Sequence, residues 1–232
     1  VSETTAGANP FDPLVSLDHI AQLQDECDYV IVLYHGGKEH YRYPSPYLQR
    51  VCRRMVDKGA DLVVCQHSHC IGAFESYKNS TIIYGQGNFL FDGSKSEFWK
   101  TSLLVEVIIN SSKITVDFIP MIKCGNGVRL AGEQEAKEIL QNFYERSRQI
   151  LDDCFLQGEY DRFAAQMLNY YLETIHGRNT VSRILNKLFK HKRMARIYSS
   201  DDLTRIQNIV ECEAHRELVL AGLKYKLKQT KN

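Results

Sequence analysis

The sequence contains no run of about 18 apolar residues, which is the length that a membrane-spanning helix requires. Its seven cysteines are odd in number and include no Cys-x-x-Cys pair, which argues against a disulfide framework and against a zinc ribbon. A charge excess is also lacking, because the formal net charge is +1, so bulk electrostatics predict no nucleic-acid partner. The cysteine usage favours a reducing compartment, and we expect a cytoplasmic protein.

The composition is that of an ordinary globular protein, with 44% hydrophobic and 25% charged residues. A length of 232 residues is enough for one large domain or for a domain with a smaller companion. Strand and helix patterns alternate up to residue 124, whereas the patterns from Gly132 onward are helical. The sequence therefore predicts an α/β region over residues 1–124 and a helical extension over residues 131–232.

Two strand patterns with a helix between them form the best-defined unit of the chain. Residues 29–34 are a continuous apolar, β-branched run, which is typical of a strand buried on both faces. A helical pattern over residues 46–58 ends at Gly59, and residues 61–65 form a second short apolar strand. This order predicts two parallel neighbouring strands joined by a right-handed crossover.

Three histidines follow these two strands. His35 comes at the end of the first strand, and His67 and His69 come directly after the second. Because ligands collect beyond the carboxyl ends of parallel strands, we expect the three imidazoles to converge there and to bind a divalent transition metal. Cys65 and Cys70 flank the histidine pair and are either further ligands or small apolar packing residues; the second interpretation is favoured.

Further strand patterns follow the histidine pair. Residues 71–76 and 81–84 read as strands, and residues 103–109 and 113–119 flank a short turn that predicts an antiparallel hairpin. Helical patterns then cover roughly residues 133–152, 159–176, 180–191 and 201–228.

Three ordered motifs carry a family resemblance. They are Tyr34-His35-Gly36-Gly37, the strand that begins at Gly59-Ala60-Asp61 and leads to His67-Ser68-His69, and Gly87-Asn88-Phe89-Leu90-Phe91-Asp92. Over about residues 15–120 the chain resembles the C-terminal half of the CapA-type proteins. These proteins are linked to capsule and poly-γ-glutamate synthesis and belong to the calcineurin-like metallophosphoesterase superfamily.

The resemblance implies the C-terminal half of a metallophosphoesterase-like αββα sandwich, followed here by the all-helical C-terminal extension. It implies that His35, His67 and His69 ligate divalent metal ions (Mn, Zn or Fe), in a centre that can be dinuclear. For the complete protein it implies metal-dependent hydrolysis in surface-polymer biosynthesis, with an anionic polymer or a phosphate-containing compound as substrate. Asn88 would then donate a hydrogen bond to the substrate oxyanion, or else serve as a turn former beside Gly87.

The sequence departs from the family pattern in three respects. Gly36 stands in place of a tryptophan, and Ser68 stands in place of a proline. The Asp and Asn-His ligands that the superfamily carries in its N-terminal half have no counterpart before residue 15. We therefore expect the missing N-terminal half of the same protein to be a partner and this chain alone to be inactive. The alternative function is a non-catalytic polymer-binding or assembly component that keeps the fold without a complete metal centre. Because some relatives of this type are anchored outside the membrane, the alternative location is that of a membrane-anchored protein with an extracytoplasmic domain.

Two further side chains lie near the motifs. His40 would reach the mouth of the site as an acid or a substrate contact, or else is a solvated loop residue, and Asp92 reads as a turn cap.

Residues 178–196 contain seven basic and no acidic side chains. This basic segment is either a docking face for phosphate, an anionic polymer or a membrane surface, or a solvated helix face; the second interpretation is favoured.

Overall fold

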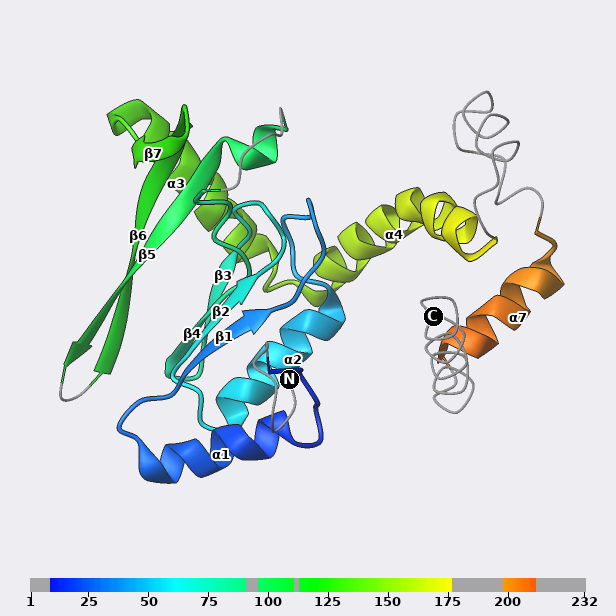
Figure 1. The fold of residues 1–232 in the computed structure, drawn as a ribbon, viewed down its shortest axis with the longest axis horizontal. Helices are drawn as coiled ribbons and strands as arrows, with labels where there is room; N and C mark the ends of the chain where they lie inside the picture. Colours follow the sequence, from blue (N-terminus) through cyan, green and yellow to red (C-terminus); the bar gives the residue numbers. More distant parts are fainter. Residues whose placement is uncertain (1–8, 91–95, 111–112, 177–197, 212–232) are drawn as a thin grey trace, which may run out of the picture. The chain divides into compact units, whose positions relative to one another are not determined.

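The computed structural model describes residues 9–90, 96–110, 113–176 and 198–211. The chain divides into two compact units, Val1–Asp161 and Arg162–Asn232, which are described separately (Figure 1). Asp92, the basic segment 178–196 and the helix predicted over residues 180–191 lie outside the described residues.

A four-stranded sheet forms the centre of the first unit (Figure 1). Its strands are β1 (Ile31–His35), β2 (Leu62–Gln66), β3 (Phe74–Tyr77) and β4 (Ser80–Ile83), arranged in the order β1-β2-β4-β3. β1 and β2 are parallel, with His35 opposite Gln66, and β2 is also parallel to β4. The predicted strand-helix-strand unit is confirmed.

Helix α2 (Pro46–Asp57) is the crossover between β1 and β2. Its start is fixed by Ser45, whose Oγ accepts a hydrogen bond from the amide of Leu48 at 3.0 Å, and by Pro46 at the first helical position. The chain leaves the helix through Gly59, which has a φ of 113°. Helices α1 (Ser16–Glu26) and α2 cover one face of the sheet, and the main core lies between them and the strands (Figure 1).

The other face of the sheet is only partly covered. A second sheet consists of β5 (Thr101–Asn110), β6 (Lys113–Cys124) and β7 (Gly127–Leu130). Valines of β5 and β6, with Phe118, pack against Leu62, Val64 and Ile83. The predicted hairpin of β5 and β6 is confirmed, whereas β7 was not expected, because its four residues are too few to show a periodic pattern.

The prediction that β1 is buried on both faces is wrong. Ile31 is 41% exposed and Leu33 is 70% exposed, although their neighbours Leu62 and Val64 in β2 are buried. The reason is position: within the described residues β1 is an edge strand, and the second sheet covers β2 and β4 but not β1. An apolar run without alternation indicates two apolar faces, but it cannot show that both are covered.

Helix α3 (Glu133–Gln149) packs against β3 and β6, so the compact unit extends past the predicted range 1–124. Phe143, Ile150 and Leu156 are buried in the same hydrophobic clusters as the strands. The hydroxyl of Ser147 also accepts a hydrogen bond from the amide of Phe74 at 2.9 Å. A helical pattern in the sequence does not reveal that its apolar face is needed to complete the sheet.

Every regular element described after β7 is a helix: α3 is followed by α4 (Asp153–His176) and α7 (Ser200–Glu211). Among the described helices, none is both long and apolar enough to cross a membrane. The coarse prediction of a mixed α/β fold is confirmed.

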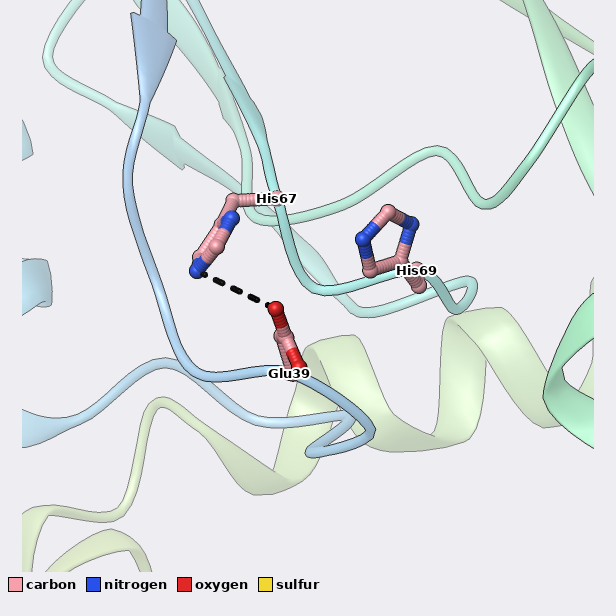
Figure 2. A group of neighbouring side chains, drawn as sticks. All are labelled: Glu39, His67 and His69. Atoms are coloured by element: carbon pink, nitrogen blue, oxygen red, sulfur yellow. Dashed lines mark ion pairs between the residues drawn. The ribbon is translucent and has the colours of Figure 1, made fainter. Parts of the chain in front are cut away.

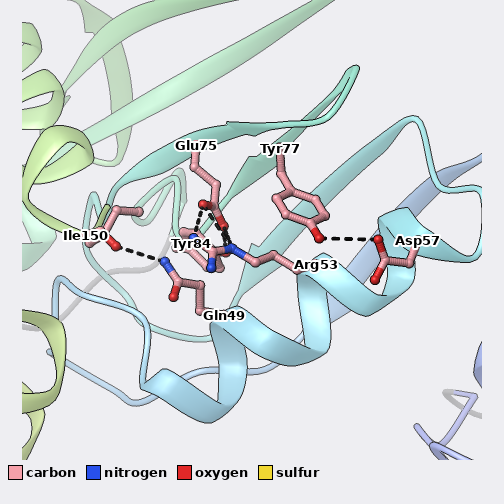
Figure 3. Close-up of polar contacts among 7 residues, drawn as sticks. All are labelled: Gln49, Arg53, Asp57, Glu75, Tyr77, Tyr84 and Ile150. Atoms are coloured by element: carbon pink, nitrogen blue, oxygen red, sulfur yellow. Dashed lines mark hydrogen bonds and ion pairs between the residues drawn. The ribbon is translucent and has the colours of Figure 1, made fainter. Parts of the chain in front are cut away.

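A buried ionic network joins α2 to the sheet (Figure 3). The side chain of Glu75, which is 1% exposed, accepts hydrogen bonds from Arg53 Nη2 at 2.7 Å and from the Tyr84 hydroxyl at 2.5 Å. Nearby, Gln49 Nε2 donates to the carbonyl of Ile150 at 2.9 Å. Burial and the adjacent carboxylate raise the pKa of Tyr84, so the phenol stays protonated as a donor.

Candidate metal centre

The parallel pairing of β1 and β2 brings the first two histidines together. His35 ends β1, His67 follows β2, and their Nε2 and Nδ1 atoms lie 3.1 Å apart. Two imidazole nitrogens that share one ion at about 2.1 Å stand roughly 3.0–3.4 Å apart. The spacing therefore fits two ligands of one ion, and without an ion one ring donates to the other.

The structure adds a carboxylate that the sequence did not single out. Glu39, His67 and His69 each offer a ligand atom within 4.8 Å of the others, and Glu39 points between the two rings (Figure 2). Its Oε1 lies 3.9 Å from His67 Nε2, on the opposite side of that ring from His35. No pattern marked Glu39, because its place depends on the path of the loop after β1.

The backbone is strained where the ligand candidates stand. The φ angles of His67 and His69 are 90° and 55°, in the left-handed region that side chains with a Cβ rarely adopt. His40, in the facing loop, has a φ of 56°, and its amide donates to the carbonyl of Ser68 at 2.7 Å. Backbone strain of this kind persists only where the surroundings enforce it, and it concentrates at functional sites.

Asn88 lies against His69 and is 6% exposed. Its Oδ1 is 2.7 Å from His69 Nδ1, so the neutral imidazole donates from Nδ1 and carries its lone pair on Nε2. Gly87 makes this contact feasible, because its φ is 81° and an added Cβ would lie 2.7 Å from the carbonyl oxygen of Thr101. The proposed substrate-donor role of Asn88 stays a prediction, and the observed contact is one that orients the ring of His69.

His40 lies beside the group rather than in it. Its Nε2 is 3.1 Å from the indole nitrogen of Trp99, which donates to it, and its ring stacks on Phe98 at 5.6 Å. Trp99 also lies 5.7 Å from the ring of His69, measured between centroids. The sequence has Gly36 where the family pattern has a tryptophan, and Trp99 supplies an indole to the site from another segment.

The electrostatics favour neutral imidazole. Burial lowers the pKa of His67, and the neighbouring rings of His35 and His69 lower it further, while Glu39 acts in the opposite direction. A neutral ring is the form that binds a metal ion, because its lone pair is free.

A cavity of about 280 Å³ opens beside the histidines and is lined also by Asn88 and residues 86–90. Neutral imidazoles with one carboxylate are a donor set that suits Zn²⁺, Mn²⁺ or Fe²⁺. Because His67 can bind one ion through only one ring nitrogen, the residues present fit either an ion shared with His35 at Nδ1 or an ion shared with Glu39 and His69 at Nε2. A second bridged ion would need a further carboxylate, and none joins this group among the described residues.

Cys65 and Cys70 are both fully buried, and neither joins a potential metal-binding group within the described residues. The Sγ atom of Cys65 lies 3.4 Å from that of Cys52, inside the main core.

Fold and site together define an α/β protein with histidines at the carboxyl ends of parallel strands. Residues 2–93 match the family model described as bacterial capsule synthesis protein PGA_cap. The resemblance to the CapA-type proteins is thereby confirmed for this part of the chain.

Two curated relatives agree with this match. The chain is 31% identical over 119 residues to the capsule biosynthesis protein CapA of Bacillus anthracis, covering 50% of this chain and 29% of that protein. It is 34% identical over 90 residues to the PGA biosynthesis protein CapA of Bacillus subtilis (strain 168), covering 39% of this chain and 24% of that protein. The alignments thus cover less than a third of each relative.

Proposed function

We propose that this chain contributes to capsule or poly-γ-glutamate biosynthesis and supplies the histidine-bearing part of a metal-dependent hydrolase centre resembling that of the phosphoesterases. The observation that carries the proposal is the grouping of Glu39, His67 and His69, with His35 against His67, inside the region similar to the capsule synthesis family. The substrate class is an anionic polymer or a phosphate-containing compound, and nucleic acid is not among the proposed partners.

The side chains of the site would have separate roles in metal binding, ring orientation and proton donation. His67 would hold a divalent ion (Mn, Zn or Fe) either through Nε2 with Glu39 and His69 or through Nδ1 with His35. When bound, the ion would supply Lewis-acid activation of water. Asn88 keeps the lone pair of His69 directed from Nε2 by accepting from Nδ1. His40 accepts from Trp99 at Nε2, so its neutral ring carries a proton on Nδ1 that it can donate at the mouth of the site.

The complete centre would need another part of the full-length protein. β1 is an edge strand in the described structure and exposes Ile31 and Leu33 on a face whose other half is packed. The backbone of an edge strand is open to pairing with a further strand, and the exposed apolar face is open to packing of a further sheet. We propose that the rest of the full-length protein covers this face, brings the missing carboxylates and completes an αββα sandwich, with the helical extension following it.

A second function is favoured by the shortage of carboxylates. Glu39 is the one carboxylate in the candidate group among the described residues, and its side chain is 54% exposed. A chain that never gains further ligands would act as a non-catalytic polymer-binding or assembly component. Membrane proximity through the basic segment 178–196 stays a prediction, as do the cytoplasmic location and its membrane-anchored alternative.

The test compares hydrolysis by the full-length protein with and without its candidate ligands. Wild type, His69→Ala and the control His19→Ala, which changes an exposed histidine of α1, are assayed on a phosphodiester with added Mn²⁺ or Zn²⁺. The enzyme proposal requires metal-dependent turnover that His69→Ala abolishes and His19→Ala retains. Saturable binding of poly-γ-glutamate without any turnover would instead support the assembly component.

A further inference from the structure

The first unit contains a half-buried guanidinium without a carboxylate partner among the described residues. Nε of Arg146, in α3, donates to the carbonyl of Gly72 at 2.8 Å, and no ion pair joins Arg146 to an acidic side chain of the described structure. Burial lowers the pKa of Arg146 to about 10, and the nearby charge of Arg42 contributes to the shift. Arginine is rarely withdrawn from water without an anion to compensate it.

A second guanidinium is fixed beside it. Nη1 of Arg42 donates to the carbonyl of Ile71 at 3.2 Å, so adjacent carbonyls in one segment hold the two arginines. The contact between Arg42 and Glu97 is loose, at 3.7 Å, and the side chain of Glu97 is 74% exposed. An exposed carboxylate at this distance neutralises little of the charge.

Both arginines line one cavity of about 490 Å³, together with Lys100. Glu135, another lining residue, is engaged with Arg129, whose Nη1 lies 2.7 Å from its carboxylate. Glu138 also lines the cavity and is exposed. The buried charge of the cavity is therefore positive, and its negative charges are exposed or already paired.

Arg42 shares an aromatic neighbour with His40, which lies beside the histidine group. The guanidinium of Arg42 stacks over Phe98 at 4.7 Å from the ring centroid, and His40 stacks on Phe98 at 5.6 Å. Ile71 and Gly72, which hold the arginines, follow His69 by two and three positions. The arginine pair and the histidine group are therefore built on neighbouring segments of one unit.

We propose that Arg42 and Arg146 form a binding site for an oxyanion, either a carboxylate or a phosphate group. Guanidinium pairs recognise such groups by parallel hydrogen bonds, and partial burial strengthens those bonds. The two arginines and their cavity are the evidence for this site, and anion binding there does not require a bound metal. Its role in catalysis rests on the proposed function: there, the arginine pair would bind a second anionic group of the substrate.

The test is titration of the full chain with inorganic phosphate and, separately, with glutarate, followed by calorimetry at low ionic strength. We expect saturable binding of at least one anion, weakened about tenfold in Arg146→Gln, which is the loss expected for one charge-assisted hydrogen bond. Arg148→Gln is the matched control, because Arg148 is exposed on the same helix and pairs with Glu145. It should bind the anion as the wild type does.

Further variants separate this proposal from folding defects and from the metal centre. Arg42→Gln, at a side chain 27% exposed, should also weaken binding about tenfold while keeping the wild-type circular dichroism spectrum. His69→Ala should leave anion binding unchanged, even if it abolishes hydrolysis. Binding of phosphate alone would assign the site to phosphate groups, and binding of glutarate alone would assign it to carboxylates. No saturable binding, or equal affinity in wild type, Arg146→Gln and Arg42→Gln, would overturn the proposal.

Discussion

Two polar clusters of the same unit are built in opposite ways. Around Glu75 the charge is buried, and both carboxylate oxygens are engaged by Arg53 and Tyr84 (Figure 3). Around His67 the side chains are partly exposed and the backbone is strained. The Nε2 atom of His67 lies 3.9 Å from the carboxylate of Glu39, beyond hydrogen-bond distance (Figure 2). The polar groups of the first cluster are paired with one another and stabilise the fold, whereas the second cluster has the strained backbone that concentrates at functional sites.

The largest expected effect is on the buried cluster. Glu75→Ala would leave Arg53 and Tyr84 without their shared acceptor, and we expect it to lower the free energy of unfolding by about 3 kcal/mol. Glu145→Ala, which removes an exposed carboxylate paired with Arg148, is the control and should cost less than about 0.5 kcal/mol. Urea denaturation followed by circular dichroism measures both, and equal losses would contradict the contrast between buried and exposed pairs.

The next largest effect compares equivalent positions on two paired strands, β1 and β2. Leu33 in β1 and Val64 in β2 are register partners, but Leu33 is 70% exposed and Val64 is 5% exposed. Val64→Ser should lower the free energy of unfolding by about 2–3 kcal/mol, because a buried methyl surface is lost and a hydroxyl is buried. Leu33→Ser in this chain should cost less than about 0.5 kcal/mol. In the full-length protein, a comparably large cost at Leu33 would show that the exposed face is covered there.

Backbone strain at the candidate metal centre predicts a variant that gains stability although a candidate ligand is lost. With EDTA present, His67→Gly should raise the free energy of unfolding by about 1 kcal/mol, because glycine adopts a φ of 90° without strain. His35→Gly, at a strand end whose φ is not in the left-handed region, should lower it by about 0.5–1 kcal/mol. Chemical denaturation decides the matter, and a loss of stability in His67→Gly would show that the loop is not strained.

The smallest effect is a pH dependence of stability. Burial and the other imidazoles lower the pKa of His67 in the folded state, so the unfolded chain binds more protons between the folded and unfolded values. The free energy of unfolding should therefore decrease as the pH falls below about 6.5, the ordinary value for histidine. His67→Gln should show a shallower decrease over that range than the wild type, and identical pH profiles would exclude a proton-linked role for His67.

Part of this arrangement could be read from the sequence. The apolar runs over residues 29–34 and 61–65, with a helical pattern between them, were enough to predict parallel strands. Parallel pairing then dictated that His35 and His67 meet, since strand ends of equal register lie at one edge. The motif order also carried the family resemblance, which the match over residues 2–93 confirms.

The rest depended on tertiary path. Glu39 reaches the site only because the loop after β1 folds back, as the hydrogen bond from the His40 amide to the Ser68 carbonyl shows. Trp99 arrives from a distant segment to cover His69. Arg146 lies on a helix whose pattern gave no sign that it packs against the sheet. Leu33 is exposed because, among the described residues, the second sheet does not cover β1, and no local sequence pattern shows this.

The most direct test is the metal content of the chain. Wild type, His69→Ala, Glu39→Gln and the control His19→Ala are dialysed against Zn²⁺ or Mn²⁺ and analysed by plasma mass spectrometry. If the strand-end group is a metal site, wild type and His19→Ala retain the ion, and His69→Ala and Glu39→Gln lose most of it, typically at least tenfold in affinity for a lost ligand. Equal metal content in all four proteins would contradict the assignment of these side chains.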